Sequence, residues 1–237
     1  MVYAKRYIRI IVMAISYNSN IVTSGLVLCV DAGNPRSYPG SGTSWRDATS
    51  SGFNFTLING PTYSSSNLGF FTFGVDDIAT AGYNTALDIQ TPSVEVWVKT
   101  NATTQNGFWF EKGSVNSQYA LFQEGTQLQW RMGPLGDCIS YPTANTMTTN
   151  VWYQVVATRT SGSQVLYING VSVASGTQTG TLSTSTSGMS IGAYGGNSGS
   201  NGYFYNGALS ICRVYNRVLS AAEVLQNFNA ARGRYGI

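Results

Sequence analysis

The stretch Ile211–Ile237, ICRVYNRVLSAAEVLQNFNAARGRYGI, predicts one short helix at the end of a chain otherwise rich in strand patterns. Ser220 and Glu223 have the S-x-x-E spacing of a capping box, which satisfies free N–H groups where a helix begins. We expect a helix over residues 220–231, with Gly233 as its stop signal. The apolar residues at helical spacing are Val224, Leu225 and Phe228. A helix this short is marginal alone, so its apolar face should pack on a larger core.

The segments before this helix alternate apolar and polar residues with the period of a β-strand. In SVEVWVK, residues 93–99, one face carries Val94, Val96 and Val98, which predicts a strand with one face in the core. The opposite face, which begins at Glu95, is expected to be solvated or partly covered. Similar strand patterns occur in WYQVVAT and LSICRVY, residues 152–158 and 209–215.

A hairpin is predicted by VLYINGVSVA, residues 165–174, where Asn169 and Gly170 separate two β-prone runs. This pair is typical of a type I′ turn, in which both central residues have positive φ. Further clusters of turn residues punctuate the chain at 34–42, 58–69 and 192–202. We therefore expect an all-β fold, a two-sheet antiparallel jelly-roll sandwich with one short C-terminal helix.

The 237 residues, 43% of them hydrophobic and 13% aromatic, are enough for one large core. We expect an N-terminal arm or upstream-start extension over 1–20 and one domain over 21–237. The net charge of +3 comes from Lys5, Arg6 and Arg9, and the remaining charges balance, so no nucleic-acid surface is indicated. No run approaches the roughly 20 apolar residues of a membrane span, and IIVMAI is short for a secretory signal.

Three cysteines, Cys29, Cys138 and Cys212, lie far apart in strand-like runs without the CxxC spacing of a metal or redox pair. We interpret them as buried free thiols, which favours folding in a reducing cytoplasm. The alternative is a single disulfide with one thiol left over.

The order of these patterns resembles the concanavalin A-like superfamily, and within it the laminin-G-like jelly-roll domains. The matching segments, in the family's order, are GLVLCVDAGNPRSYPGSGTSW, FTFGVDD, VEVWVKT, WYQVVATR, LYINGV, MSIGAY, YFYNGALSICRVYNRVLSAAEV and NFNAARGRYGI. The Asn-Arg-x-Leu-Ser-x-x-Glu-Val segment at 216–224 and Gly-Arg-Tyr-Gly at 233–236 resemble stand-alone copies in tailed-bacteriophage virions. The resemblance implies a sandwich that binds glycans or coats a particle, although fold alone establishes neither.

One departure from the family concerns a metal site. Many relatives read Phe-Asp-Gly-x-x-Asp where this chain reads Phe73-Gly74-Val75-Asp76-Asp77, so the first aspartate is missing. Calcium is the one cofactor that we consider, and Asp76 and Asp77 are its candidate ligands because adjacent carboxylates and loop carbonyls suit a hard cation. The alternative is a solvated turn at a strand end.

Catalysis finds little support in the sequence. The chain has no histidine, which excludes His-dependent triads and most zinc sites. GMSIG at 188–192 matches the G-x-S-x-G elbow, but it has the pattern of a strand and no histidine can activate Ser190. A glycoside hydrolase needs two carboxylates on either side of the bond that it cleaves. The glutamates, all isolated in sequence, are Glu95, Glu111, Glu124 and Glu223.

Aromatic residues flanking loops are candidates for stacking on sugar rings, with nearby amides to orient the sugar. The candidates are Trp109, Tyr194, Asn197, Asn201, Tyr203 and Tyr205. In an alternating strand such as YFYNG, half of the aromatic rings must instead face the core.

Three functional hypotheses follow from the sequence. The first is a non-enzymatic virion protein, a capsid-decoration or tail-associated homo-oligomer (dimer or trimer) assembled in the host cytoplasm, whose arm contacts other virion proteins. The second is a module that binds host-surface polysaccharide, and the third is a glycoside hydrolase.

Overall fold

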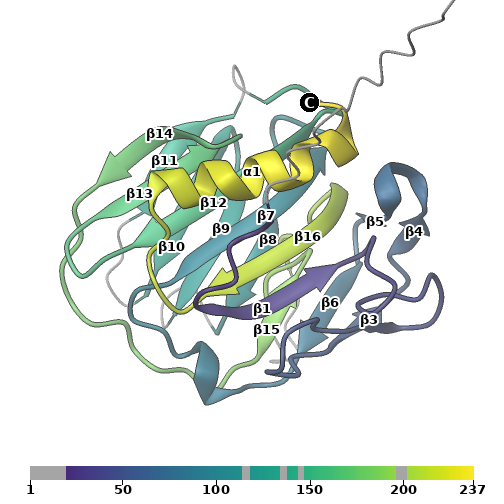
Figure 1. Cartoon of the computed structure of the whole chain (residues 1–237), viewed down its shortest axis with the longest axis horizontal. Coiled ribbons are helices and arrows are strands. Elements are labelled where there is room, and N and C mark those ends of the chain that lie inside the picture. Colours follow the sequence, from purple (N-terminus) through teal and green to yellow (C-terminus); the bar gives the residue numbers. More distant parts are fainter. Residues whose placement is uncertain (1–19, 114–117, 134–137, 144–146, 196–201) are drawn as a thin grey trace, which may run out of the picture.

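The computed structural model describes residues 20–113, 118–133, 138–143, 147–195 and 202–237. Two eight-stranded sheets pack face to face, and every pairing between their strands is antiparallel. One α-helix, α1 (Ala221–Tyr235), lies across the outer face of one sheet (Figure 1). The predicted fold class, a two-sheet jelly-roll sandwich with a C-terminal helix, is confirmed.

Sheet A, the sheet under the helix, has the order β14-β13-β12-β7-β16-β5-β4. β16 also pairs with β1, through residues 211–215, whereas β5 pairs with residues 207–209. Its strands are β1 (Leu26–Asp31), β4 (Thr62–Ser64), β5 (Phe70–Phe73), β7 (Ser93–Thr100), β12 (Trp152–Arg159), β13 (Gln164–Ile168), β14 (Val171–Gly176) and β16 (Gly207–Tyr215).

Sheet B has the order β11-β10-β9-β8-β15-β6-β3-β2. Its strands are β2 (Ser44–Trp45), β3 (Phe55–Ile58), β6 (Ile78–Ala81), β8 (Gly107–Lys112), β9 (Tyr119–Glu124), β10 (Gln127–Met132), β11 (Cys138–Pro142) and β15 (Met189–Ile191). Two 3₁₀ turns, η1 (Ser66–Leu68) and η2 (Thr85–Leu87), lie in the connections.

The local predictions for strands are confirmed where the signal was strong. Val94, Val96 and Val98 lie in the main core between the sheets. Asn169 and Gly170 have φ of 51° and 80° and join β13 to β14, as a type I′ hairpin requires.

The outer face of β7 differs from the prediction. Glu95 and Trp97 are both fully buried, because α1 covers them. The Trp97 ring stacks on Phe228, with centroids 6.0 Å apart, and on Tyr235, with centroids 4.3 Å apart. The expected solvated or partly covered face is therefore a second hydrophobic interface, between sheet A and the helix.

A hydrogen-bond network around the buried Glu95 carboxylate fixes the helix on this sheet. Its Oε1 accepts hydrogen bonds from Trp97 Nε1 (3.1 Å), Gln154 Nε2 (3.0 Å) and Arg213 Nη1 (2.9 Å). Its Oε2 accepts one from Asn227 Nδ2 of α1 at 2.8 Å. A buried charge is tolerated only when it is paired and hydrogen-bonded, and these contacts meet that requirement.

The helix begins as predicted and ends later. The Ser220–Glu223 capping box is formed, and an ion pair at 2.6 Å joins Glu223 Oε1 to Arg217 Nη2. The stop expected at Gly233 is wrong, because α1 continues to Tyr235 and is capped by Gly236 in the left-handed conformation, with φ of 73°. Burial of the Tyr235 ring outweighs the roughly 1 kcal/mol that glycine costs inside a helix.

One of the three apolar helix residues expected to pack on the core does not do so. Val224 and Phe228 are buried as expected, whereas Leu225 is 44% exposed.

Of the cysteines, Cys29 and Cys212 are free and buried, as predicted. The side chain of Cys138 lies outside the described residues.

Candidate functional site

The predicted glycan-binding residues fall into three groups. Tyr194 and Tyr203 lie together in a cleft on the outer face of sheet B. Trp109 and Tyr205 are fully buried and pack edge to face in the core, with ring centroids 6.0 Å apart, so neither can stack on a sugar. Asn197 and Asn201 lie outside the described residues.

The assignment of Trp109 and Tyr205 to the site was wrong for physical reasons. The register of β8 against β9 shifts between Phe108 and Phe110, and this β-bulge places both Trp109 and Phe110 in the core. Tyr205 lies just before β16 and faces inward, whereas Tyr203 faces solvent.

The cleft encloses about 230 Å³. Three adjacent strands, β8, β9 and β10, form its floor, because they pair in sequence. Tyr194 and Tyr203, from the connection between β15 and β16, line its side. The lining residues are Asn106, Phe108, Phe122, Gln123, Glu124, Arg131, Tyr194 and Tyr203.

Four aromatic rings give the cleft its apolar character. Phe108 and Phe122 are cross-strand partners whose rings stack with centroids 4.3 Å apart and planes inclined by 3°. Tyr194 meets Phe108 edge-on at 5.4 Å, and Tyr203 lies 6.2 Å from Tyr194 with the ring planes nearly perpendicular. Both phenylalanines are buried, so Tyr203, 56% exposed, is the ring most open to a ligand.

The backbone holds Tyr203 in this position. Tyr194 and Gly202 exchange two backbone hydrogen bonds, of 2.8 and 3.1 Å, which fix the residue before Tyr203. The Phe108 N–H donates to the Tyr203 carbonyl at 3.2 Å. Tyr203 has φ of 48°, an uncommon conformation for a bulky residue, and backbone strain of this kind is typical of ligand-binding positions.

Polar groups line the rim beside these rings. Glu124 Oε2 accepts hydrogen bonds from Gln129 Nε2 at 2.8 Å and Arg131 Nη2 at 3.3 Å. Arg131 also lies over the Phe122 ring, 4.9 Å from its centroid. The exposed Asn106 uses its Oδ1 to accept from the Gly125 N–H, at 2.8 Å. An aromatic face with hydroxyl, amide and carboxylate groups around it suits a polyhydroxylated ligand.

Several residues of the cleft were not predicted from the sequence. Phe108, Phe122, Glu124 and Arg131 come from three strands, and only their pairing brings them together. The alternation in QLQWRM, residues 127–132, was a usable signal, because it places Arg131 opposite the core residues Leu128 and Trp130.

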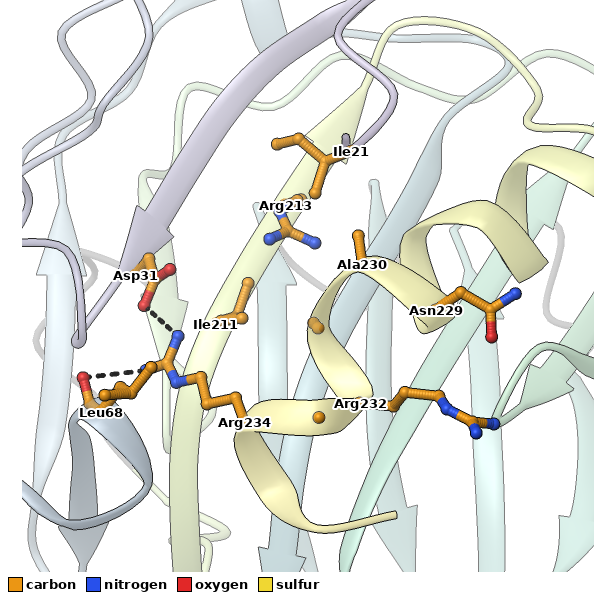
Figure 2. Close-up of a pocket in the computed structure, with 11 residues that line it drawn as sticks. Ile21, Asp31, Leu68, Ile211, Arg213, Asn229, Ala230, Arg232 and Arg234 are labelled. Atoms are coloured by element: carbon orange, nitrogen blue, oxygen red, sulfur yellow. Dashed lines mark hydrogen bonds and ion pairs between the residues drawn. The ribbon is translucent and has the colours of Figure 1, made fainter. Parts of the chain in front are cut away.

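A larger hollow of about 560 Å³ lies between α1 and strands β1 and β16. Figure 2 shows Arg234 reaching from the helix towards Asp31, while Arg232 points to the other side of the helix. Arg234 donates to Asp31 Oδ1 at 2.7 Å and to the Gly69 carbonyl at 2.6 Å. The described residues that line this hollow include no aromatic ring, and Arg234 uses its charge to hold the helix against β1, so we do not assign the ligand site to it.

A family model described as the concanavalin A-like lectin/glucanases superfamily matches residues 72–225. The chain belongs to this superfamily. No curated protein sequence matches the chain.

Solved structures show the same fold at low sequence identity. The receptor binding domain of the botulinum neurotoxin C/D mosaic serotype is 14% identical, with a TM-score of 0.67 over 86% of this chain and 51% of that one. The binding domain of Paraclostridial Mosquitocidal Protein 1 is 14% identical, with a TM-score of 0.66 over 87% and 52%. The botulinum neurotoxin DC binding domain in complex with sialyl-T is 13% identical, with a TM-score of 0.68 over 87% and 51%. The chain spans about half the length of each of these domains.

The superfamily includes glucanases, so the positions of the glutamates matter. Glu95 is buried under α1, and Glu223 caps that helix. Glu111 is buried on β8 and accepts a hydrogen bond from the Gly195 N–H at 2.9 Å. Glu124 is the one carboxylate among the described residues that line the cleft. Ser190 of the G-x-S-x-G match lies buried in strand β15, as its strand pattern predicted.

The candidate calcium ligands follow β5. Asp77 Oδ2 accepts a hydrogen bond from the Gly74 N–H at 2.8 Å, and the Asp76 carbonyl accepts one from Asn59 Nδ2 at 2.8 Å. The described residues contain no group of three or more acidic, histidine or cysteine side chains that could hold a metal ion. Calcium takes six to eight oxygen ligands, of which two aspartates supply only a part, and calcium binding at Asp76 and Asp77 stays a prediction.

Within the described ranges, no helix is long and apolar enough to cross a membrane.

Proposed function

We propose that the chain is a non-enzymatic glycan-binding module whose sugar site is the cleft over β8, β9 and β10. The observation that carries this proposal is the exposed, backbone-fixed ring of Tyr203 beside Tyr194, with Glu124 and Asn106 at the rim. A pyranose ring offers an apolar C–H face to the tyrosine and hydroxyl groups to the polar rim.

Two further observations support binding rather than hydrolysis. The structural neighbours are binding domains, one of them in complex with sialyl-T, although the likeness covers about half of each. Hydrolysis of a glycosidic bond ordinarily uses two carboxylates, and Glu124 is the one carboxylate among the described lining residues.

The test is a glycan array probed with the full chain, followed by calorimetric titration of the best ligand. Tyr203→Ala should weaken binding at least tenfold, a loss of about 1.4 kcal/mol, because it removes the exposed ring face against which the sugar would pack. Tyr83→Ala is the matched control, since Tyr83 is also exposed, at 38%, but lies outside the cleft. Equal affinity of the two variants, or turnover of a polysaccharide that depends on Glu124, would contradict the proposal.

The setting that we propose is the particle of a tailed bacteriophage, as a capsid-decoration or tail-associated protein assembled in the host cytoplasm. This placement is supported by the sequence resemblance of segments 216–224 and 233–236 alone. A homo-oligomer on the particle would multiply weak glycan contacts by avidity.

The basic arm gives this setting its test. Lys5, Arg6 and Arg9 suit an acidic groove on a neighbouring virion protein. We expect a chain lacking residues 1–12 to lose binding to purified particles while keeping its affinity for glycan. Undiminished particle binding by the shortened chain would contradict the role of the arm.

A further inference from the structure

The charged atoms at the rim of the cleft are unequally available to a ligand. Glu124 Oε2 already accepts hydrogen bonds from Gln129 and Arg131. Glu124 Oε1 accepts none within the part of the chain that the structure describes, and the side chain is 45% exposed. The open charged atom at this rim is therefore a carboxylate oxygen.

The cation at the same rim is occupied. Arg131 pairs with Glu124 at 3.3 Å, and its Nη2 also lies 3.4 Å from Gln129 Oε1. Its guanidinium covers the Phe122 ring at 4.9 Å, and its side chain is 27% exposed. Arg131 thus extends the apolar floor and has its charge balanced, so it is not set to capture an incoming anion.

Size restricts the ligand further. The cleft of about 230 Å³ is smaller than the roughly 300–1,000 Å³ of sites for drug-sized ligands. A single ring at the end of a glycan fits this volume better than an internal stretch of several sugars.

We propose that the cleft selects the terminal sugar of a neutral glycan, with a hydroxyl group donating to Glu124 Oε1, and discriminates against sugars that carry a carboxylate or sulfate. This inference rests on the proposed glycan-binding function and names the ligand class of the same site. A sugar hydroxyl forms a charge-assisted hydrogen bond with the carboxylate, whereas an anionic substituent is repelled by it.

The experiment compares matched glycans that end in galactose with the same glycans capped by sialic acid, titrated against the full chain. Neutral ligands should bind at least tenfold more tightly. In Glu124→Gln this ratio should fall towards one or invert, because the repelling charge is gone and Arg131 loses its partner. Asn229→Lys is the control: it raises the net charge by one, as Glu124→Gln does, at an exposed position outside the cleft, and should leave the ratio unchanged.

A second measurement needs no variant. In 1 M salt, where screening reduces the Debye length to about 3 Å, the preference for neutral glycans should shrink while stacking on Tyr203 persists. Equal or tighter binding of the sialylated glycans at low salt would overturn the proposed ligand class and leave the glycan-binding function standing. Absence of binding to every glycan on the array would overturn both.

Discussion

Asn227 offers the sharpest test of how the helix is held on sheet A. Its Nδ2 donates to Glu95 Oε2 at 2.8 Å and to the Tyr215 hydroxyl at 2.9 Å, and its Oδ1 accepts from the Val22 N–H at 2.8 Å. The side chain is fully buried, so water cannot replace these contacts. Asn227→Ala therefore removes every one of them and leaves their partners buried.

The expected loss in the free energy of unfolding is about 2.5–6 kcal/mol. A hydrogen bond to a charged group contributes about 1.5–3 kcal/mol, and each of the two neutral ones contributes about 0.5–1.5 kcal/mol. Glu95 Oε2 has no other hydrogen-bond donor among the described residues. Most of the loss therefore comes from leaving this buried carboxylate oxygen without a hydrogen bond. The loss is a large part of the 5–15 kcal/mol by which proteins of this kind are stable.

Urea unfolding followed by tryptophan fluorescence measures this change, since Trp97 lies beneath the helix. Asn229→Ala is the matched control, because Asn229 is an exposed asparagine two positions along α1 and should cost less than about 0.5 kcal/mol. A difference below about 1 kcal/mol between the two variants would refute the role assigned to the network.

Two further predictions concern titratable groups. Hydrogen bonds from Arg217 and from the start of the helix lower the pKa of Glu223 from its ordinary value near 4.5 to about 2, so its stabilising contribution is present above pH 4.5 and is lost as the pH falls towards 2. The stability difference between the wild type and Glu223→Gln should shrink over that range in urea titrations, and a difference independent of pH would contradict this origin. Burial raises the pKa of the Cys29 and Cys212 thiols, so native Cys138→Ser protein should show no thiol that reacts rapidly with an aromatic disulfide reagent, and two thiols after unfolding in urea. Rapid reaction of the native variant would contradict the burial of these two thiols.

The sequence predicted those features whose causes are local. The start of α1 follows from a capping box of four residues, and the β13–β14 hairpin follows from two turn residues. The end of α1 at Tyr235 could not be predicted in the same way, because it depends on the contacts of that ring with Trp97 and Trp152. Residues more than eighty positions apart set the boundary.

In the candidate site, too, residues marked by local sequence could be predicted, whereas residues brought together by strand pairing could not. Tyr194 and Tyr203 could be chosen because they flank an evident loop. Trp109 flanks a loop as well, and only a register shift in β8 turns it into the core. Glu124 and Arg131 gave no sign of a common site, because their proximity arises from the pairing of β9 with β10.

The pairing of β7 with β16 has a consequence for how the protein is made. The central strand of sheet A, β7, ends at Thr100, yet one of its partners begins at Gly207 and its helical cover begins at Ala221. On the ribosome, a nascent chain of 200 residues would lack the strand and the helix that cover Trp97 and Glu95 in the folded protein. Chains interrupted at that stage would expose the Trp97 ring and the Glu95 carboxylate, which the folded protein buries. Chaperones and proteases act on exposed apolar surface of this kind. The outer face of β7 is therefore completed only after synthesis has passed α1.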